Sequence, residues 1–283
     1  MMGPQNEIHR PVLVYRGGRW GGAALLLAAA ALALYLFDRP DEPANGGTAL
    51  GYVLGVIGLG LIFWLAWYGI RRRQYGPGGK PLEAWLSAHL YLGLALPIVA
   101  TLHTGFRWHW NIHGLAFVLM VLVVLSGLFG LYAYLRYPAR AAVNLDGADR
   151  RRLAAEIAAL DLDCRDKALG FDDRTLALVT AATERGSPGT GWRLRRGGGV
   201  LDGATEAAID HLRGLLRGEA ALVPDAVLPL VLALTRRATL VERARRDFRY
   251  RLLLTAWRSV HLVLSLGLLA ALTIHVVVVF YNR

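Results

Sequence analysis

The run HLYLGLALPIVATLH, residues His89–His103, is apolar along its length and has a histidine at each end. A second run of the same length, HLVLSLGLLAALTIH at His261–His275, shares both features. Each run lies in a longer apolar block, and a membrane-spanning helix needs about 20 mostly apolar residues. Five blocks qualify, which predicts an all-α integral membrane protein with a bundle of five transmembrane helices: Trp20–Phe37, Leu50–Ile70, Trp85–His103, Ile112–Leu135 and Leu253–Phe280.

The composition supports a membrane protein and limits its chemistry. Charged residues make up 19% of the 283 residues, against about 25% in ordinary soluble domains. The single cysteine, Cys164, excludes a disulfide framework, a cysteine-ligated zinc site and an iron–sulfur cluster. A metal or cofactor would therefore need histidine, carboxylate or backbone ligands. The net charge of +11 arises from Lys and Arg residues in loops on one side of the predicted spans, as described next. Membrane orientation explains such a distribution, so we expect no nucleic-acid partner.

Basic residues alternate between the two sides of the predicted spans. Three arginines precede the first span, whereas the loop after it has only Arg39. The second loop is basic, the third holds only Arg107, and 21 Lys and Arg follow in residues 136–251 before Arg283 at the end. The positive-inside rule then predicts a multi-pass protein of a bacterial-type inner (plasma) membrane, with a cytoplasmic N-terminus and a periplasmic C-terminus. We expect the first span to be a retained anchor rather than a cleaved signal.

Residues 136–251 change from continuous apolar runs to amphipathic ones, which predicts a mainly helical cytoplasmic domain inserted between the fourth and fifth helices. The chain then divides into a cytoplasmic segment (1–19), four transmembrane helices (20–135), the helical domain (136–251) and the fifth helix with a short outer tail (252–283). Leu222–Thr235 is too short to span and is expected in the core or at the interface. Arg236–Arg251 is expected to run into the last span at the anionic membrane surface.

The histidine spacing carries the functional prediction. Fourteen residues correspond to about 1400° of helical rotation, ~40° short of four turns, so both histidines of a run share a face, ~21 Å apart. The third and fifth spans run parallel in this topology, which pairs His89 with His261 and His103 with His275 in depth. Zinc prefers four ligands, whereas two axial histidines suit a haem iron. Alternatively, each histidine could simply hydrogen-bond a neighbouring helix.

The two runs resemble the ligand pattern of di-haem b-type membrane cytochromes, in which His-x13-His on each of two helices holds two stacked haems. Cytochrome b subunits of quinone-linked complexes and the membrane domains of ferric reductases and NADPH oxidases share this arrangement. The resemblance covers about half to two-thirds of the chain and implies two haem b groups, on the pairs His89/His261 and His103/His275. Only a short tail that ends at Arg283 follows the last span, so we expect no flavin and nicotinamide domain and an electron donor on another molecule.

Other residues are secondary candidates. Arg258 could pair with the propionates of the inner haem and Arg107 with those of the outer one, or both could anchor lipid headgroups. The outer loop could form a quinone site in which His109 or His113 exchanges protons, or an interfacial aromatic belt; its residues of interest are Trp108, His109, Trp110 and His113. His113 is also an alternative axial ligand. Five glycines could admit a macrocycle or pack helices: Gly51, Gly55, Gly58, Gly127 and Gly130.

These observations predict a membrane cytochrome b, the electron-transfer subunit of an oxidoreductase complex. It would carry electrons through two bis-histidine haems between a quinone pool and a partner, and no residue would make or break substrate bonds. The expected partner is a flavin or iron–sulfur subunit that docks on residues 136–251, whose basic face could instead contact membrane lipid. One alternative is a transmembrane reductase that passes cytoplasmic electrons to an outer metal ion or cytochrome without quinone. Another is a haem-free membrane scaffold.

Overall fold

The structure, a computed structural model, describes residues 13–38, 46–74, 80–136, 147–185, 203–217 and 224–281. These residues form helices and turns, and no strand occurs among them, so the fold is all-α as predicted. The chain divides into two compact units. Unit 1 comprises Met1–Arg136 and Ala256–Arg283, and unit 2 comprises Tyr137–Thr255. The predicted N-terminal segment 1–19 lies largely outside the described residues.

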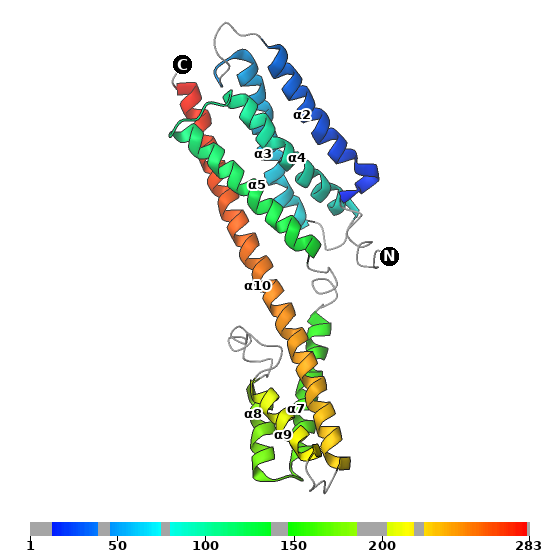
Figure 1. The fold of residues 1–283 in the computed structure, drawn as a ribbon. Helices are drawn as coiled ribbons and strands as arrows, with labels where there is room; N and C mark the ends of the chain where they lie inside the picture. The colour runs from blue at the N-terminus through cyan, green and yellow to red at the C-terminus, as the bar shows by residue number, and fades with distance from the viewer. Residues whose placement is uncertain are drawn as a thin grey trace. The chain divides into compact units, whose positions relative to one another are not determined.

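Unit 1 contains the apolar helices. They are α2 (Arg19–Phe37), α3 (Ala49–Gln74), α4 (Lys80–Thr104), α5 (Ile112–Arg136) and the part of α10 (Pro224–Tyr281) that begins at Ala256 (Figure 1). All five helices are long and apolar enough to cross a membrane. The chain is therefore a multi-pass membrane protein.

Helix α4 is the centre of unit 1 because it packs against both α2 and α3. Leu54 of α3 and Val99 of α4 are fully buried in one apolar cluster with Ala31 of α2. A second cluster joins Leu96 of α4 to Leu268 of α10, together with side chains of α3 and α5. Many other leucines and valines of these helices are exposed, as side chains that face lipid would be.

A short turn connects α4 to α5 and places a histidine on each side of it. Gly105 and Phe106 have positive φ (59° and 60°), and their N–H groups donate to the carbonyls of Leu102 and Thr101, which ends α4. The Asn111 side-chain oxygen then accepts from the N–H groups of His113 and Gly114 at 3.0 and 3.1 Å, so it caps α5. His103 and His113 consequently lie at adjoining helix ends.

Unit 2 contains α7 (Gly147–Ala168), α8 (Asp173–Arg185), α9 (Gly203–Arg217) and the part of α10 up to Thr255. Their apolar faces form one core, in which Cys164, Val179, Leu212 and Leu230 are fully buried. The predicted stretch Leu222–Thr235 thus contributes core side chains from Val227 onward. It also belongs to the last helix, because α10 is continuous from Pro224. The fifth span therefore has no helix start of its own at Leu253.

Arg237 and Arg245 of unit 2 are both buried, and Arg237 forms an ion pair in the core. The Arg237 side chain is 1% exposed; its Nε donates to the Asp161 carboxylate, and its Nη2 donates to the Thr183 carbonyl at 2.8 Å. The preceding Arg236 pairs with Glu156 at 2.8 Å, but these side chains are 67% and 43% exposed. At least one of the basic residues in 136–251, Arg237, is therefore paired within the core and does not face a partner or a lipid headgroup.

The thiol of Cys164 offers a measurable consequence of this core. Burial, reinforced by the neighbouring Asp163 carboxylate, raises the pKa of the thiol from 9.0 to about 11. A thiol with this higher pKa has a roughly 100-fold smaller thiolate fraction at pH 8 than a thiol with a pKa of 9.0. The thiolate is the form that reacts. We expect iodoacetamide to modify Cys164 at least about 100-fold more slowly in the folded full-length chain than in urea. Equal rates in the two conditions would contradict the burial of this thiol.

Candidate functional site

The structure brings the four predicted ligands together as two depth-matched pairs within unit 1. His89 and His261 line one pocket, and we call this pair the His89 layer. At the other end of the same helices, the rings of His103 and His275 have centroids 6.3 Å apart. His113 lies against His275, and we call these three residues the His103 layer. Proximity is thus as predicted, whereas ligation of haem stays a prediction.

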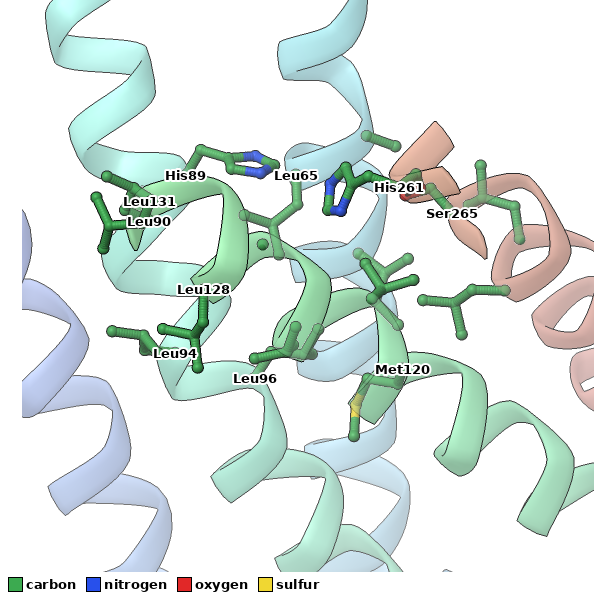
Figure 2. A pocket seen from close by; sticks show the side chains of 18 residues that line it. Leu65, His89, Leu90, Leu94, Leu96, Met120, Leu128, Leu131, His261 and Ser265 are labelled. Atoms are coloured by element: carbon green, nitrogen blue, oxygen red, sulfur yellow. Dashed lines mark hydrogen bonds between the residues drawn. The ribbon is translucent and has the colours of Figure 1, made fainter. Parts of the chain in front are cut away.

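The pocket of the His89 layer is apolar. Its lining comes from α3, α4, α5 and α10, consists mostly of leucine and valine, and includes Gly93 and Gly127. It holds about 760 Å³ of empty space, including the space at its open side. Figure 2 shows the imidazoles of His89 and His261 extending toward one another from their two helices, with Leu65 between them. Two polar rings thus share a cavity that is otherwise lined almost entirely by apolar side chains.

His89 is incompletely satisfied in this setting. Its Nδ1 is buried and has no hydrogen-bond partner, although the Leu65 carbonyl lies near the ring. The Tyr68 ring packs beside it, with centroids 4.8 Å apart. An unsatisfied buried polar group costs about 1–3 kcal/mol, so a ring placed here needs a compensating interaction. The other three candidate ligands, His103, His261 and His275, each have such a partner on Nδ1.

His261 is held by α5. Its Nδ1 lies 2.6 Å from Ser126 Oγ, and Ser126 Oγ lies 2.9 Å from the Val123 carbonyl oxygen. One turn earlier on α10, the Trp257 indole N–H donates to the Ser126 carbonyl at 2.7 Å. Trp257 and His261 are therefore both fixed to α5 at the same residue.

His103 is held by α3. Its Nδ1 lies 2.7 Å from the carbonyl oxygen of Gly51, which can only accept, so the ring proton sits on Nδ1 and the lone pair on Nε2. The ring lies against Gly55, where an added Cβ would come within 2.8 Å of His103 Cε1. A backbone carbonyl on Nδ1 is the usual partner of a histidine that binds metal through its other nitrogen.

His275 is held by α5, as His261 is. Its Nδ1 lies 2.6 Å from Nδ1 of His113, so one ring donates and the other accepts. Helix α3 thus supplies a carbonyl to His103 of α4, and α5 supplies a polar group to each histidine of α10. The position of His113 is thus explained by its hydrogen bond with His275. Its predicted roles, at a quinone site or as an alternative ligand, stay predictions.

The predicted glycines separate into different roles. Gly55 leaves space for the ring of His103, and Gly130 leaves space for the indole of Trp257. Both glycines therefore allow close packing of helices. Gly127 lines the pocket, and a Cβ there would meet His261 Cε1 at 3.7 Å. A Cβ on Gly58 would meet nothing within 4 Å, so the structure gives no reason for glycine at that position.

The remaining candidates lie at the surface. The side chains of Arg107 and Arg258 are exposed, and their pairing with propionates stays a prediction. In the loop between α4 and α5, Trp108 packs edge-on against Trp110, which is 92% exposed, and His109 is exposed beside them. None of these loop residues lines the pocket of the His89 layer. The predicted quinone residues are therefore split: His113 reaches the His103 layer, and the other three remain on the exposed loop.

Sequence reasoning missed Trp257, although a signal for it exists. When residues 85–103 are laid on residues 257–275, nine of 19 positions are identical, beginning with W-x-S-x-H-L in both segments. The repeat places a tryptophan four residues before each histidine of the His89 layer. Trp85 stacks on Trp64 of α3, with ring centroids 5.0 Å apart, whereas Trp257 packs on α5. Both tryptophans thus attach a ligand-bearing helix to its supporting helix.

Gly130 offers a test of this attachment. A Cβ at Gly130 would overlap the indole of Trp257, which is held in place by its bond to Ser126. We expect Gly130→Ala to displace the indole and to destabilise unit 1 by about 1–3 kcal/mol, the usual cost of overpacking. The measurement is the Tm of the detergent-solubilised full chain. Gly60→Ala is the control, because its Cβ would meet nothing within 4 Å. Equal Tm values for the two variants would contradict the packing described.

No protein-family model, no curated protein and no solved structure matches this chain. Function must therefore be inferred from the site itself. Among the described residues, no group of three or more His, Cys, Asp or Glu side chains is arranged to hold a bare metal ion. Two facing histidines in an apolar pocket instead fit an iron whose other ligands come from a macrocycle. The residues of the His89 layer therefore fit a haem.

Proposed function

We propose that this protein is a membrane cytochrome b that transfers electrons through two haems, one at each histidine layer. The observation that carries the proposal is the meeting of His89 and His261 across an apolar pocket, repeated four turns along the same two helices by His103 and His275. Histidines at such depth are costly in a membrane and commonly functional. Two pairs on the same helices are difficult to explain as independent packing residues.

A haem bound at each layer would supply one-electron chemistry, and this chain would supply its surroundings. The histidines would hold the haem iron, the leucines of α4 and α5 would keep water away from it, and the groups on α3 and α5 would orient the imidazoles. The layers are ~21 Å apart along a helix, which places them toward opposite faces of a hydrocarbon core of about 30 Å. The proposed task is therefore electron transfer across the membrane.

The proposal includes the orientation and partners expected from the sequence. The N-terminus and unit 2 would be cytoplasmic, the His89 layer would lie toward the cytoplasm, and the His103 layer would lie toward the periplasm of a bacterial-type inner membrane. A flavin or iron–sulfur subunit would dock on unit 2. A quinone would react beside the His103 layer, where the titratable ring of His113 contacts His275.

The test is anaerobic reduction of the purified full-length protein, first with a quinol and then with dithionite, followed by absorbance spectroscopy. We expect dithionite to reveal two b-type haems and the quinol to reduce at least one of them. Haem that dithionite reduces and quinol does not would overturn the quinone link and favour the transmembrane reductase. A protein without b-type absorbance after dithionite would overturn the proposal and leave a haem-free scaffold.

A further inference from the structure

We propose that Ser126 is the positioning residue for His261: it fixes the ring proton on Nδ1 and leaves Nε2 as the metal-binding nitrogen. This inference rests on the proposed haem function and adds a residue that the histidine spacing does not reveal. Ser126 lies on α5, 135 residues from His261 in the chain, and contacts it at 2.6 Å.

The hydrogen-bond directions follow from the groups present. The Val123 carbonyl oxygen can only accept, so at 2.9 Å it takes the single hydroxyl hydrogen of Ser126. The serine oxygen then has only lone pairs to offer to His261, and the 2.6 Å contact requires a hydrogen on His261 Nδ1. A neutral imidazole protonated at Nδ1 carries its lone pair on Nε2. The chain His261 Nδ1–H to Ser126 O–H to Val123 carbonyl thus sets one tautomer.

The position of Ser126 is itself fixed. Its carbonyl accepts the Trp257 indole N–H at 2.7 Å, one helical turn from the contact with His261. Gly130 leaves the space that this indole occupies, and Gly127 leaves ordinary contact distance for the imidazole. The hydroxyl therefore faces the ring at a fixed register between α5 and α10. His103 has the equivalent support from the Gly51 carbonyl, whereas His89 has no partner on Nδ1.

Loss of this bond has two expected effects. Without an oxygen that accepts the hydrogen bond from Nδ1, the ring of His261 can rotate or take the other tautomer. Removal of such a partner of a metal ligand typically weakens metal binding about 10–100-fold. The hydrogen bond also makes Nε2 more basic, which favours ferric over ferrous iron. Ser126→Ala should therefore release the haem of the His89 layer about 10–100-fold faster and shift its reduction potential to a more positive value.

The experiment compares Ser126→Ala, Ser126→Thr and Ser265→Ala in the full-length holoprotein. Ser265 lines the same pocket, but its hydroxyl bonds to the carbonyl of His261 and not to the ring, so its loss measures the effect of removing a hydroxyl alone. The readouts are the rate of haem transfer to a scavenger protein, the low-spin ferric EPR signal and the potential of each haem. We expect Ser126→Ala to change all three for one haem only, and Ser126→Thr to retain values near those of the wild type.

Two outcomes overturn the inference, and they are distinguishable. If the wild type binds two haems and Ser126→Ala matches Ser265→Ala in all three readouts, Ser126 does not position His261. If the wild type binds no haem, the proposed function fails together with the inference. Should Ser126→Ala not be recovered as folded protein, ¹⁵N NMR of histidine-labelled wild type decides, because a His261 proton on Nε2 contradicts the assignment.

Discussion

His89→Ala and His261→Ala are each expected to remove the same one of two haems, and the double variant to remove no more than either alone. Both imidazoles face one pocket, so a single haem there would be held by both residues. Loss of either histidine would leave this haem without a stable pair of ligands. Residues that act as a unit are non-additive. His103→Ala and His275→Ala should behave in the same way toward the other haem.

The decisive comparison combines residues of the same helix. His89→Ala/His103→Ala changes two histidines of α4 but affects both layers, so we expect it to remove both haems, whereas His89→Ala/His261→Ala removes one. His109→Ala is the matched control, because this histidine lies on the exposed loop outside the pocket. Haem per chain is measured for each purified variant. Loss of both haems from His89→Ala/His261→Ala would contradict the pairing by depth.

Arg237→Met is expected to destabilise unit 2 by about 3–5 kcal/mol, the usual cost of removing one partner of a buried ion pair. The substitution leaves the Asp161 carboxylate, 14% exposed, without its arginine and leaves the Thr183 carbonyl without this donor. Arg236→Met is the matched control, because an exposed ion pair contributes about 0–1 kcal/mol. Adjacent arginines on one helix thus have different expected effects.

The rate of Cys164 alkylation measures this loss, because the thiol lies in the core of unit 2 and is the single cysteine of the chain. At 1.4 kcal/mol per tenfold, 3–5 kcal/mol corresponds to about two to three and a half orders of magnitude in the population of the open form. We expect such an acceleration in Arg237→Met and little change in Arg236→Met. The double variant Asp161→Leu/Arg237→Met should recover much of the loss, because apolar groups often replace a buried ion pair without cost. Equal rates in both single variants would contradict a structural role for Arg237.

The helices and the approximate histidine pairs could be predicted from the sequence because they depend on local properties. Long apolar runs determine the spans, and a 14-residue spacing places both histidines on one face without knowledge of the neighbouring helix. The amphipathic pattern of residues 136–251 likewise predicted a mainly helical domain, and the described part of unit 2 forms α7, α8, α9 and the first part of α10. The basic run Arg236–Arg251 was correctly expected to continue into the last span, and α10 is continuous there.

The groups that support the histidines could not be predicted, because they depend on how each helix is rotated about its axis. Helix α5 is apolar all round, so its pattern does not indicate that Ser126 faces His261 or that His113 faces His275. The buried role of Arg237 depends on Asp161, 76 residues away, and a count of basic residues treats it like its exposed neighbours. Such contacts are properties of the folded chain and have no local signature.

The most direct test of the account is the ratio of haem to polypeptide in the detergent-purified wild-type protein, produced with ample haem. A pyridine haemochrome assay gives the haem type and amount, and amino-acid analysis gives the chain concentration. Two facing histidine pairs predict two b-type haems per chain. A haem-free preparation that is otherwise folded, with Cys164 protected from alkylation, would contradict the cytochrome and leave the histidines as packing residues of a membrane scaffold.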